Sequence, residues 1–138
     1  MTEPRHNEPL VPESIVNARA RPDVMLLGPA WPDRALLRAQ LIEEGYEVVA
    51  IDGWPMPRLY RRPEMTPRVM IVDLRDLPQP RETLEQITWV VPAGRVLVVS
   101  ALGTLPPEEV RRMGFTVIER PATVGAIVSA AAALLARS

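Results

Sequence analysis

Residues 69–78 read VMIVDLRDLP, an apolar run that stops at a carboxylate, Asp73. Four consecutive apolar residues followed by a turn signal are typical of a strand buried on both faces. An acid at the end of such a strand is a phosphate acceptor, a metal ligand or a polar residue that closes the strand. The remaining residues decide among these roles.

Apolar runs alternate with amphipathic segments along most of the chain. We predict strands at residues 24–27, 47–51, 69–72, 96–99 and 115–118, and helices at residues 33–44, 81–89, 107–113 and 123–136. Apolar strands that alternate with helices indicate a parallel sheet with helices on both faces. Five strands with helices between most of them fit an α/β, flavodoxin-like, doubly wound fold with strand order 2-1-3-4-5.

Helical spacing predicts which side chains of these helices face the core. They are Leu36, Leu37 and Leu41 in the first helix, Leu84, Ile87 and Trp89 in the second, and Ile127, Val128, Ala131, Leu134 and Leu135 in the last.

The residues that follow the predicted strands are the candidates for function, because in this type of fold the functional crevice lies beyond the carboxyl ends of the strands. They are Gly28, Pro29, Asp52, Asp73, Ser100 and Arg120. We expect Asp73, Ser100 and Arg120 to meet at one edge of the sheet.

Composition narrows the range of functions. The 138 residues fit one domain, residues 23–138, after a proline-rich segment, residues 1–22, that we expect to be a flexible tail. A net charge of −1 gives no general attraction for nucleic acid or for an anionic membrane. The chain has no cysteine, and its single histidine, His6, lies in the tail, which disfavours thiol and histidine chemistry. Without a signal segment we expect a cytoplasmic protein.

Four segments follow one another in a characteristic order: LLRAQLIEEGYEVVAIDG at residues 36–53, VMIVDLRDLP at 69–78, VLVVSA at 96–101 and IERP at 118–121. Together they resemble the receiver domain of the response regulators of two-component signalling. The resemblance puts the phosphoacceptor position at Asp73 and the hydroxyl position at Ser100. It puts the family's lysine and proline at Arg120 and Pro121.

Two departures from the family pattern affect the expected function. Receivers carry two adjacent acids after the first strand, which hold Mg²⁺ together with the acceptor aspartate; Gly28 and Pro29 stand there in this chain. Mg²⁺ demands near-octahedral oxygen ligation, so Asp73 alone is a poor site. We interpret the next carboxylate, Asp33, as a helix cap. The chain contains no lysine, and Arg120 takes that position. We therefore expect no metal and no cofactor.

Two interpretations of Asp73 stay open at this point. Arginine is a planar fork that grips a carboxylate with two bonds, so Arg120 would pair with Asp73 directly when no metal competes. Alternatively, Asp73 accepts backbone N–H bonds at a turn after its strand. Ser100 is interpreted as a turn hydroxyl rather than as a phosphate ligand.

An arginine-rich stretch, GWPMPRLYRRPEMTP at residues 53–67, replaces the second helix of the family. Its four prolines limit helix formation. Arg58, Arg61 and Arg62 would offer a basic surface to an acidic partner, but we favour a solvated loop and disfavour nucleic-acid binding.

The last predicted helix carries small residues outside its core positions, including Ala130 and Ala133. Small side chains permit close approach of a second helix, and in receivers this region often forms the dimer surface. A core helix with an alanine-rich exposed side explains the same pattern, and the two interpretations stay open.

We predict a stand-alone pseudo-receiver that acts through a protein partner, or as a homodimer through its last helix. The second hypothesis is a receiver that is phosphorylated on Asp73, and the third is a flavodoxin-like binder of a small ligand. An enzyme is disfavoured, because the strand ends assemble no acid–base pair and no nucleophile–base pair.

Overall fold

The computed structural model describes residues 21–29, 32–54 and 66–137. Most of the predicted tail, and Arg58, Arg61 and Arg62, lie outside these residues. Of the tail, Pro22 belongs to the folded domain, because its carbonyl accepts a hydrogen bond from the Arg68 N–H at 3.0 Å.

The strands and helices of the described residues follow one another in the predicted order. The strands are β1 (Val24–Leu27), β2 (Val48–Ile51), β3 (Val69–Asp73), β4 (Val96–Val99) and β5 (Thr116–Ile118). The helices are α2 (Pro32–Glu43), α4 (Pro80–Ile87), α5 (Pro107–Arg112) and α6 (Val124–Arg137), with a 3₁₀ turn, η2 (Ala93–Arg95), before β4. All strands pair in parallel in the order β2-β1-β3-β4-β5, which confirms the predicted fold.

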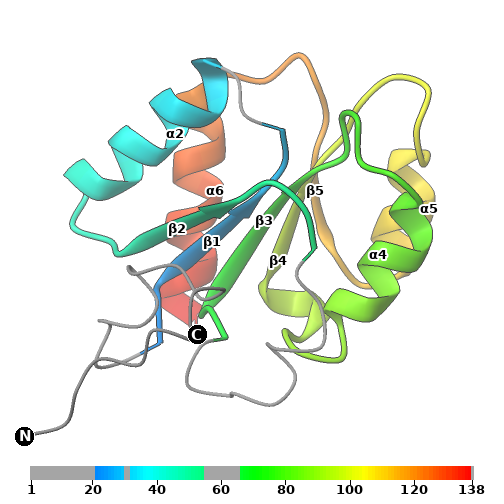
Figure 1. The fold of residues 1–138 in the computed structure, drawn as a ribbon, viewed down its shortest axis with the longest axis horizontal. Coiled ribbons are helices and arrows are strands. Elements are labelled where there is room, and N and C mark those ends of the chain that lie inside the picture. Colours follow the sequence, from blue (N-terminus) through cyan, green and yellow to red (C-terminus); the bar gives the residue numbers. More distant parts are fainter. Residues whose placement is uncertain (1–20, 30–31, 55–65, 138) are drawn as a thin grey trace, which may run out of the picture.

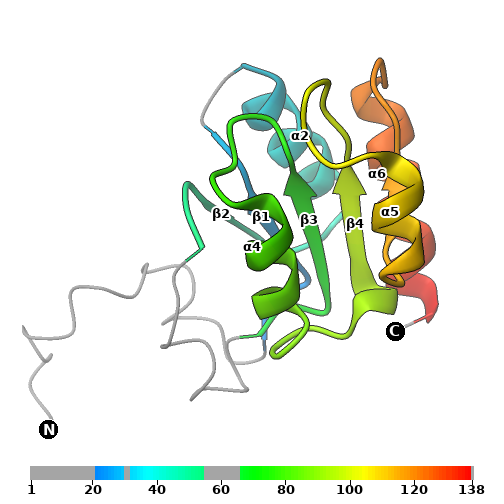
Figure 2. The ribbon, with the colours of Figure 1, turned by 90° about the vertical axis from the view of Figure 1, so that its right-hand side faces the viewer.

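Helices cover both faces of the sheet (Figure 1). α2 and α6 lie on one face, while α4 and α5 lie on the other, in front of the sheet in Figure 2. Because strand side chains alternate between faces, each strand contributes to two core clusters. Met25, Met70 and Val98 pack under α4 and α5. Leu26 and Ile71 pack under α2 and α6.

The core positions of the helices are mostly as predicted, with two corrections. Leu37 and Leu41 are buried, but Leu36 is 50% exposed, because adjacent residues of a helix point about 100° apart and only one of them faces the sheet. Trp89 is 72% exposed, because α4 ends at Ile87 and residues beyond its C-cap no longer follow helical spacing.

Because Leu41 is buried and Leu36 is half-exposed, we expect their replacement by alanine to change the stability of the protein by different amounts. Leu41→Ala should lower the free energy of unfolding by about 2–5 kcal/mol, because it leaves a cavity under α2. Leu36→Ala, on the same helix, should change it by less than about 0.5 kcal/mol. Urea unfolding followed by circular dichroism measures both values. Equal losses would contradict the orientation of α2.

Candidate functional site

Three polar residues meet where β3, β4 and β5 end. Asp73 is the last residue of β3, so the strand extends one residue beyond its predicted end at Val72. Ser100 follows β4, and its N–H donates to the Ile118 carbonyl of β5 at 2.9 Å. Because β3, β4 and β5 are parallel neighbours, their carboxyl ends bring Asp73, Ser100 and Arg120 to one edge, as the sequence predicted.

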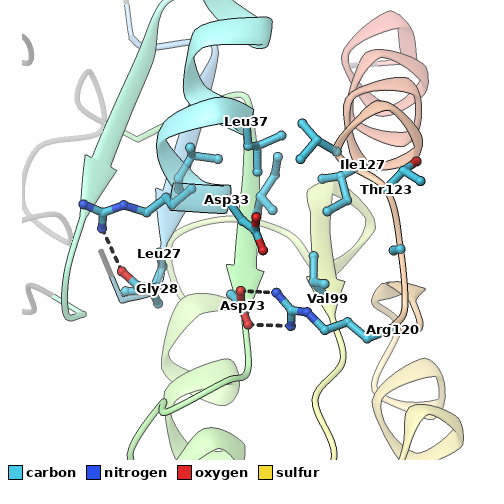
Figure 3. A pocket seen from close by; sticks show the side chains of 14 residues that line it. Leu27, Gly28, Asp33, Leu37, Asp73, Val99, Arg120, Thr123 and Ile127 are labelled. Atoms are coloured by element: carbon cyan, nitrogen blue, oxygen red, sulfur yellow. Dashed lines mark hydrogen bonds and ion pairs between the residues drawn. The ribbon is translucent and has the colours of Figure 1, made fainter. Parts of the chain in front are cut away.

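Arg120 grips the Asp73 carboxylate with two bonds (Figure 3). Nη1 donates to Oδ1 at 2.8 Å and Nη2 donates to Oδ2 at 2.5 Å. The Asp73 side chain is 11% exposed and that of Arg120 is 25% exposed, so the pair is largely shielded from water. Such two-bond arginine–carboxylate contacts are among the strongest polar interactions in proteins.

Ser100 holds Arg120 in place from a second direction. Arg120 Nη1 also donates to the Ser100 carbonyl at 3.0 Å, and the backbone N–H of Arg120 donates to Ser100 Oγ at 3.2 Å. The Arg120–Pro121 peptide bond is cis. The Ser100 hydroxyl therefore orients the turn after β5, as expected for a turn hydroxyl.

Asp73 also closes the turn after its own strand. The backbone N–H of Arg75 donates to Asp73 Oδ1 at 2.8 Å, a contact two residues along the chain that is typical of an Asx turn. The two interpretations that the sequence left open therefore hold at once: Asp73 forms an ion pair and accepts a backbone bond.

A second arginine lies between two carboxylates at this edge. Arg75 Nη2 is 3.7 Å from Asp73 Oδ2 and 4.0 Å from Asp33 Oδ2. Asp33 is not the cap of its helix: α2 begins at Pro32, so Asp33 belongs to the first turn, where a carboxylate interacts favourably with the helix dipole. Figure 3 shows Asp33 pointing from α2 toward Asp73.

An arginine contacts the end of β1, where the receiver family carries two acids. Arg34 Nη1 donates to the Gly28 carbonyl at 2.7 Å and to Asp52 Oδ1 at 2.8 Å. Gly28 itself donates from its N–H to the Ile51 carbonyl at 3.2 Å. Sequence reasoning selected Gly28 and Asp52 but missed Arg34 and Arg75. The available signal was their position in the sequence: Arg34 directly follows Asp33, and Arg75 lies two residues after Asp73.

A pocket of about 260 Å³ opens at this edge, above the carboxyl ends of β1, β3 and β4. Its floor and walls are apolar side chains of the strands, α2 and α6. Polar groups of Asp33, Arg34, Asp73, Arg120 and Thr123 complete its lining.

The donor set does not fit the Mg²⁺ that the receiver fold implies. Mg²⁺ takes six oxygen ligands in near-ideal geometry. Here Arg120 engages both oxygens of Asp73, and Gly28 and Pro29 carry no carboxylate. Within the described ranges, no three histidine, cysteine, aspartate or glutamate residues gather in a group able to hold a metal ion.

Comparison with known proteins extends the fold assignment. The sequence matches no protein-family model and no curated protein. It is similar in structure to an adenylate cyclase from Rhodopirellula baltica, with a TM-score of 0.68 and 18% identity over 85% of this chain and 89% of that chain. It is also similar to the signal receiver domain of a putative Luxo repressor protein from Vibrio parahaemolyticus, with a TM-score of 0.64 and 20% identity over 85% and 92% of the two chains.

A third similar structure is the receiver domain of a sensor histidine kinase from Pseudomonas aeruginosa, with a magnesium ion in its active-site cleft. Its TM-score is 0.61 and its identity 15%, over 85% of this chain and 99% of that chain. The chain has the receiver-domain fold. At these identities the likeness is one of fold. Among the described helices, none has the length and apolar character needed to cross a membrane.

The Asp73–Arg120 pair should contribute measurably to stability. A double-mutant cycle with Asp73→Asn, Arg120→Met and the double variant should give a coupling energy of about 1–3 kcal/mol. The reason is that both side chains are largely shielded from water and are joined by two hydrogen bonds. The exposed pair between Arg111 and Glu119, 46% and 56% exposed, is the matched control and should give about 0.2–1 kcal/mol. Urea unfolding of all variants provides the numbers. Equal coupling in both cycles would contradict a special role for Asp73 and Arg120.

Proposed function

We propose that this chain is a receiver-like signalling domain that acts by binding a protein partner, without Mg²⁺-dependent phosphorylation of Asp73. The observation that carries the proposal is the two-bond contact of Arg120 with Asp73. In this contact Arg120 donates hydrogen bonds to both carboxylate oxygens, one of which would have to attack the phosphoryl group in a phosphorylation reaction.

Phosphoryl transfer depends on positioned cations that neutralise developing charge, and on a nucleophile aligned with the leaving group. Asp73 Oδ1 accepts from both Arg120 and the Arg75 N–H, while Oδ2 accepts from Arg120. An attack by either oxygen would first have to break a charge-assisted hydrogen bond in a shielded site. The missing acids at Gly28 and Pro29 remove the ligands that would hold a metal to assist it.

The charges at this edge balance without a metal. Asp33 and Asp73 carry negative charge, while Arg75 and Arg120 carry positive charge within 4.0 Å of them. A guanidinium is part of the chain, so these two cations cannot leave the site as a bound metal ion can. They supply the neutralisation that a bound divalent cation supplies when adjacent acids are present.

The alternative is a receiver that is phosphorylated on Asp73. The observation in its favour is that Asp73, Ser100 and a cationic side chain retain their places at the carboxyl ends of β3, β4 and β5. The two functions differ in one measurable property, the acceptance of a phosphoryl group by Asp73.

Incubation with acetyl phosphate and millimolar MgCl₂ should leave the intact mass of the protein unchanged. The physical reason is that Arg120 binds both oxygens of the Asp73 carboxylate, and that Gly28 and Pro29 supply no carboxylate ligand for Mg²⁺. Calorimetric titration with MgCl₂ should show no saturable site.

The Asp73→Asn variant is the control for this experiment. A mass increase of one phosphoryl group in the wild type that disappears in Asp73→Asn would establish the alternative. A saturable Mg²⁺ site that disappears in Asp73→Asn would overturn the proposal in the same way.

We assign partner contact to the exposed side of α6. Ala126 and Ala133 are two turns apart and both exposed, so they lie on one side of the helix. Ala130, which the sequence analysis grouped with Ala133, is half-buried and packs against the core cluster under α2 and α6. It is therefore the less suitable position for a test, because a large side chain there would disturb the core.

Introducing charge on this side of α6 should abolish partner binding while leaving the fold intact. The variant Ala126→Glu/Ala133→Glu adds two negative charges, and Arg38→Glu on α2 is the control with the same change in net charge. Light scattering measures self-association, and co-purification measures partner recovery. An unchanged oligomeric state together with unchanged partner recovery would exclude the exposed side of α6 as the contact surface.

A further inference from the structure

We propose that the pocket between α2 and α6 binds a small amphipathic amine, with its ammonium group at Asp33 and its apolar group between the two helices. This site is separate from the proposed contact with a protein partner. Through it, the domain would respond to a small molecule without being phosphorylated. Its position, shape and charge each contribute to the argument.

The position is that of a ligand site in open α/β sheets. Such sheets bind ligands beyond the carboxyl ends of their strands, next to the point where the strand order reverses. In the order β2-β1-β3-β4-β5 that point lies between β1 and β3. The pocket is lined by Leu27 of β1 and by Ile71 and Asp73 of β3, so it lies at this point.

The lining suits a compact apolar group. Leu37 of α2 lies opposite Ile127 of α6, and the strands form the floor (Figure 3). The apolar lining residues are Leu26, Leu27, Leu37, Ile71, Val99, Ala122, Val124 and Ile127. A volume of about 260 Å³ is slightly below the usual range for drug-sized ligands, which indicates a short aliphatic or single-ring group.

Among the residues that the structure describes, the charged side chains that line the pocket form hydrogen bonds within the protein, except that of Asp33. Arg34 binds Gly28 and Asp52, and Arg120 binds Asp73. Asp33 differs: across the part of the chain that the structure describes, the only cationic atom within 4.0 Å of it is Arg75 Nη2, at 4.0 Å, which is beyond hydrogen-bond distance.

The group that complements Asp33 is therefore a cationic donor. Its side chain is 69% exposed at the mouth of the pocket, so its oxygens are accessible to a ligand. An ammonium group offers three N–H donors and a positive charge, so it can form the hydrogen bonds that Arg75, at 4.0 Å, does not form with Asp33. A ligand carboxylate would meet the negative charge of Asp33, and the arginines that line the pocket already have carboxylate partners.

A ligand in the pocket would contact the start of α6, the helix whose exposed side we assign to partner contact. Thr123 and Val124 line it, and they form the start of α6, where Thr123 Oγ accepts the Ala126 N–H at 3.0 Å. A ligand at this point contacts both Arg120 and the first turn of α6. This regulatory consequence, unlike the site itself, depends on the proposed function.

The probe is n-pentylamine, with pentan-1-ol and pentanoate as matched compounds of the same chain length. Titration into the full ¹⁵N-labelled chain should give saturable shifts for the amides of Leu37, Thr123 and Ile127. Pentan-1-ol should bind at least tenfold more weakly, and pentanoate should give no saturable shifts. No saturation with the amine, tighter binding of pentanoate, or shifts centred elsewhere would overturn the proposal.

Four variants test where the amine binds; one of them is a control and one is a replacement. Asp33→Asn keeps the shape of the side chain and should weaken pentylamine binding at least tenfold, while Glu43→Gln, at the other end of α2, removes an equal charge and should leave binding unchanged. Val124→Phe should fill the pocket and abolish binding; Ala122→Leu replaces it if Val124→Phe fails to fold. Undiminished binding by Asp33→Asn would overturn the proposal. Phosphorylation of Asp73 would refute the proposed function but not the amine site, and absent amine binding would refute the site alone.

Discussion

The contact between Arg120 and Asp73 is the constraint on which the rest of this sheet edge depends. A guanidinium binds a carboxylate with two bonds only when the two groups are coplanar, so it fixes orientation as well as distance. Arg120 reaches Asp73 from the turn after β5, and the Ser100 hydroxyl and carbonyl hold it from the end of β4. Three strand ends are thereby tied together. A lysine, with one flexible ammonium group, would not impose this geometry.

The arginines also explain how two carboxylates can lie close together at this edge. Asp33 and Asp73 point toward the same space, and two negative charges in a partly dehydrated site disfavour each other unless cations lie nearby. Arg75 lies between them, at 4.0 and 3.7 Å, and Arg120 neutralises Asp73 directly. Arg34 does the same for Asp52 at the end of β2. These cations are part of the chain, so the protein itself supplies the charge that offsets the two carboxylates.

Much of this architecture could be predicted from the sequence, because continuous apolar runs define parallel strands and strand ends converge at one edge. That reasoning correctly brought Arg120 to Asp73. It did not identify Arg34 or Arg75, since their contacts depend on side-chain rotamers and on the path of the turns, which no spacing rule encodes. It also placed Leu36 and Trp89 in the core, because periodicity alone does not decide which of two adjacent apolar residues faces the sheet or where a helix ends.

Under the proposed function, the contact between Arg120 and Asp73 limits the kinds of signal to which the domain could respond. A ligand shifts a conformational equilibrium only by the difference in its affinity for the two states. A phosphoryl group on Asp73 would provide such a difference by displacing Arg120, but the proposed function excludes its transfer, because Arg120 contacts both carboxylate oxygens. The pocket offers another route to the same residues, since Arg120 and the first turn of α6 share its lining. A molecule that fits the pocket only when α6 and α2 stand at their present separation would stabilise that arrangement. The exposed side of α6 would then report its presence.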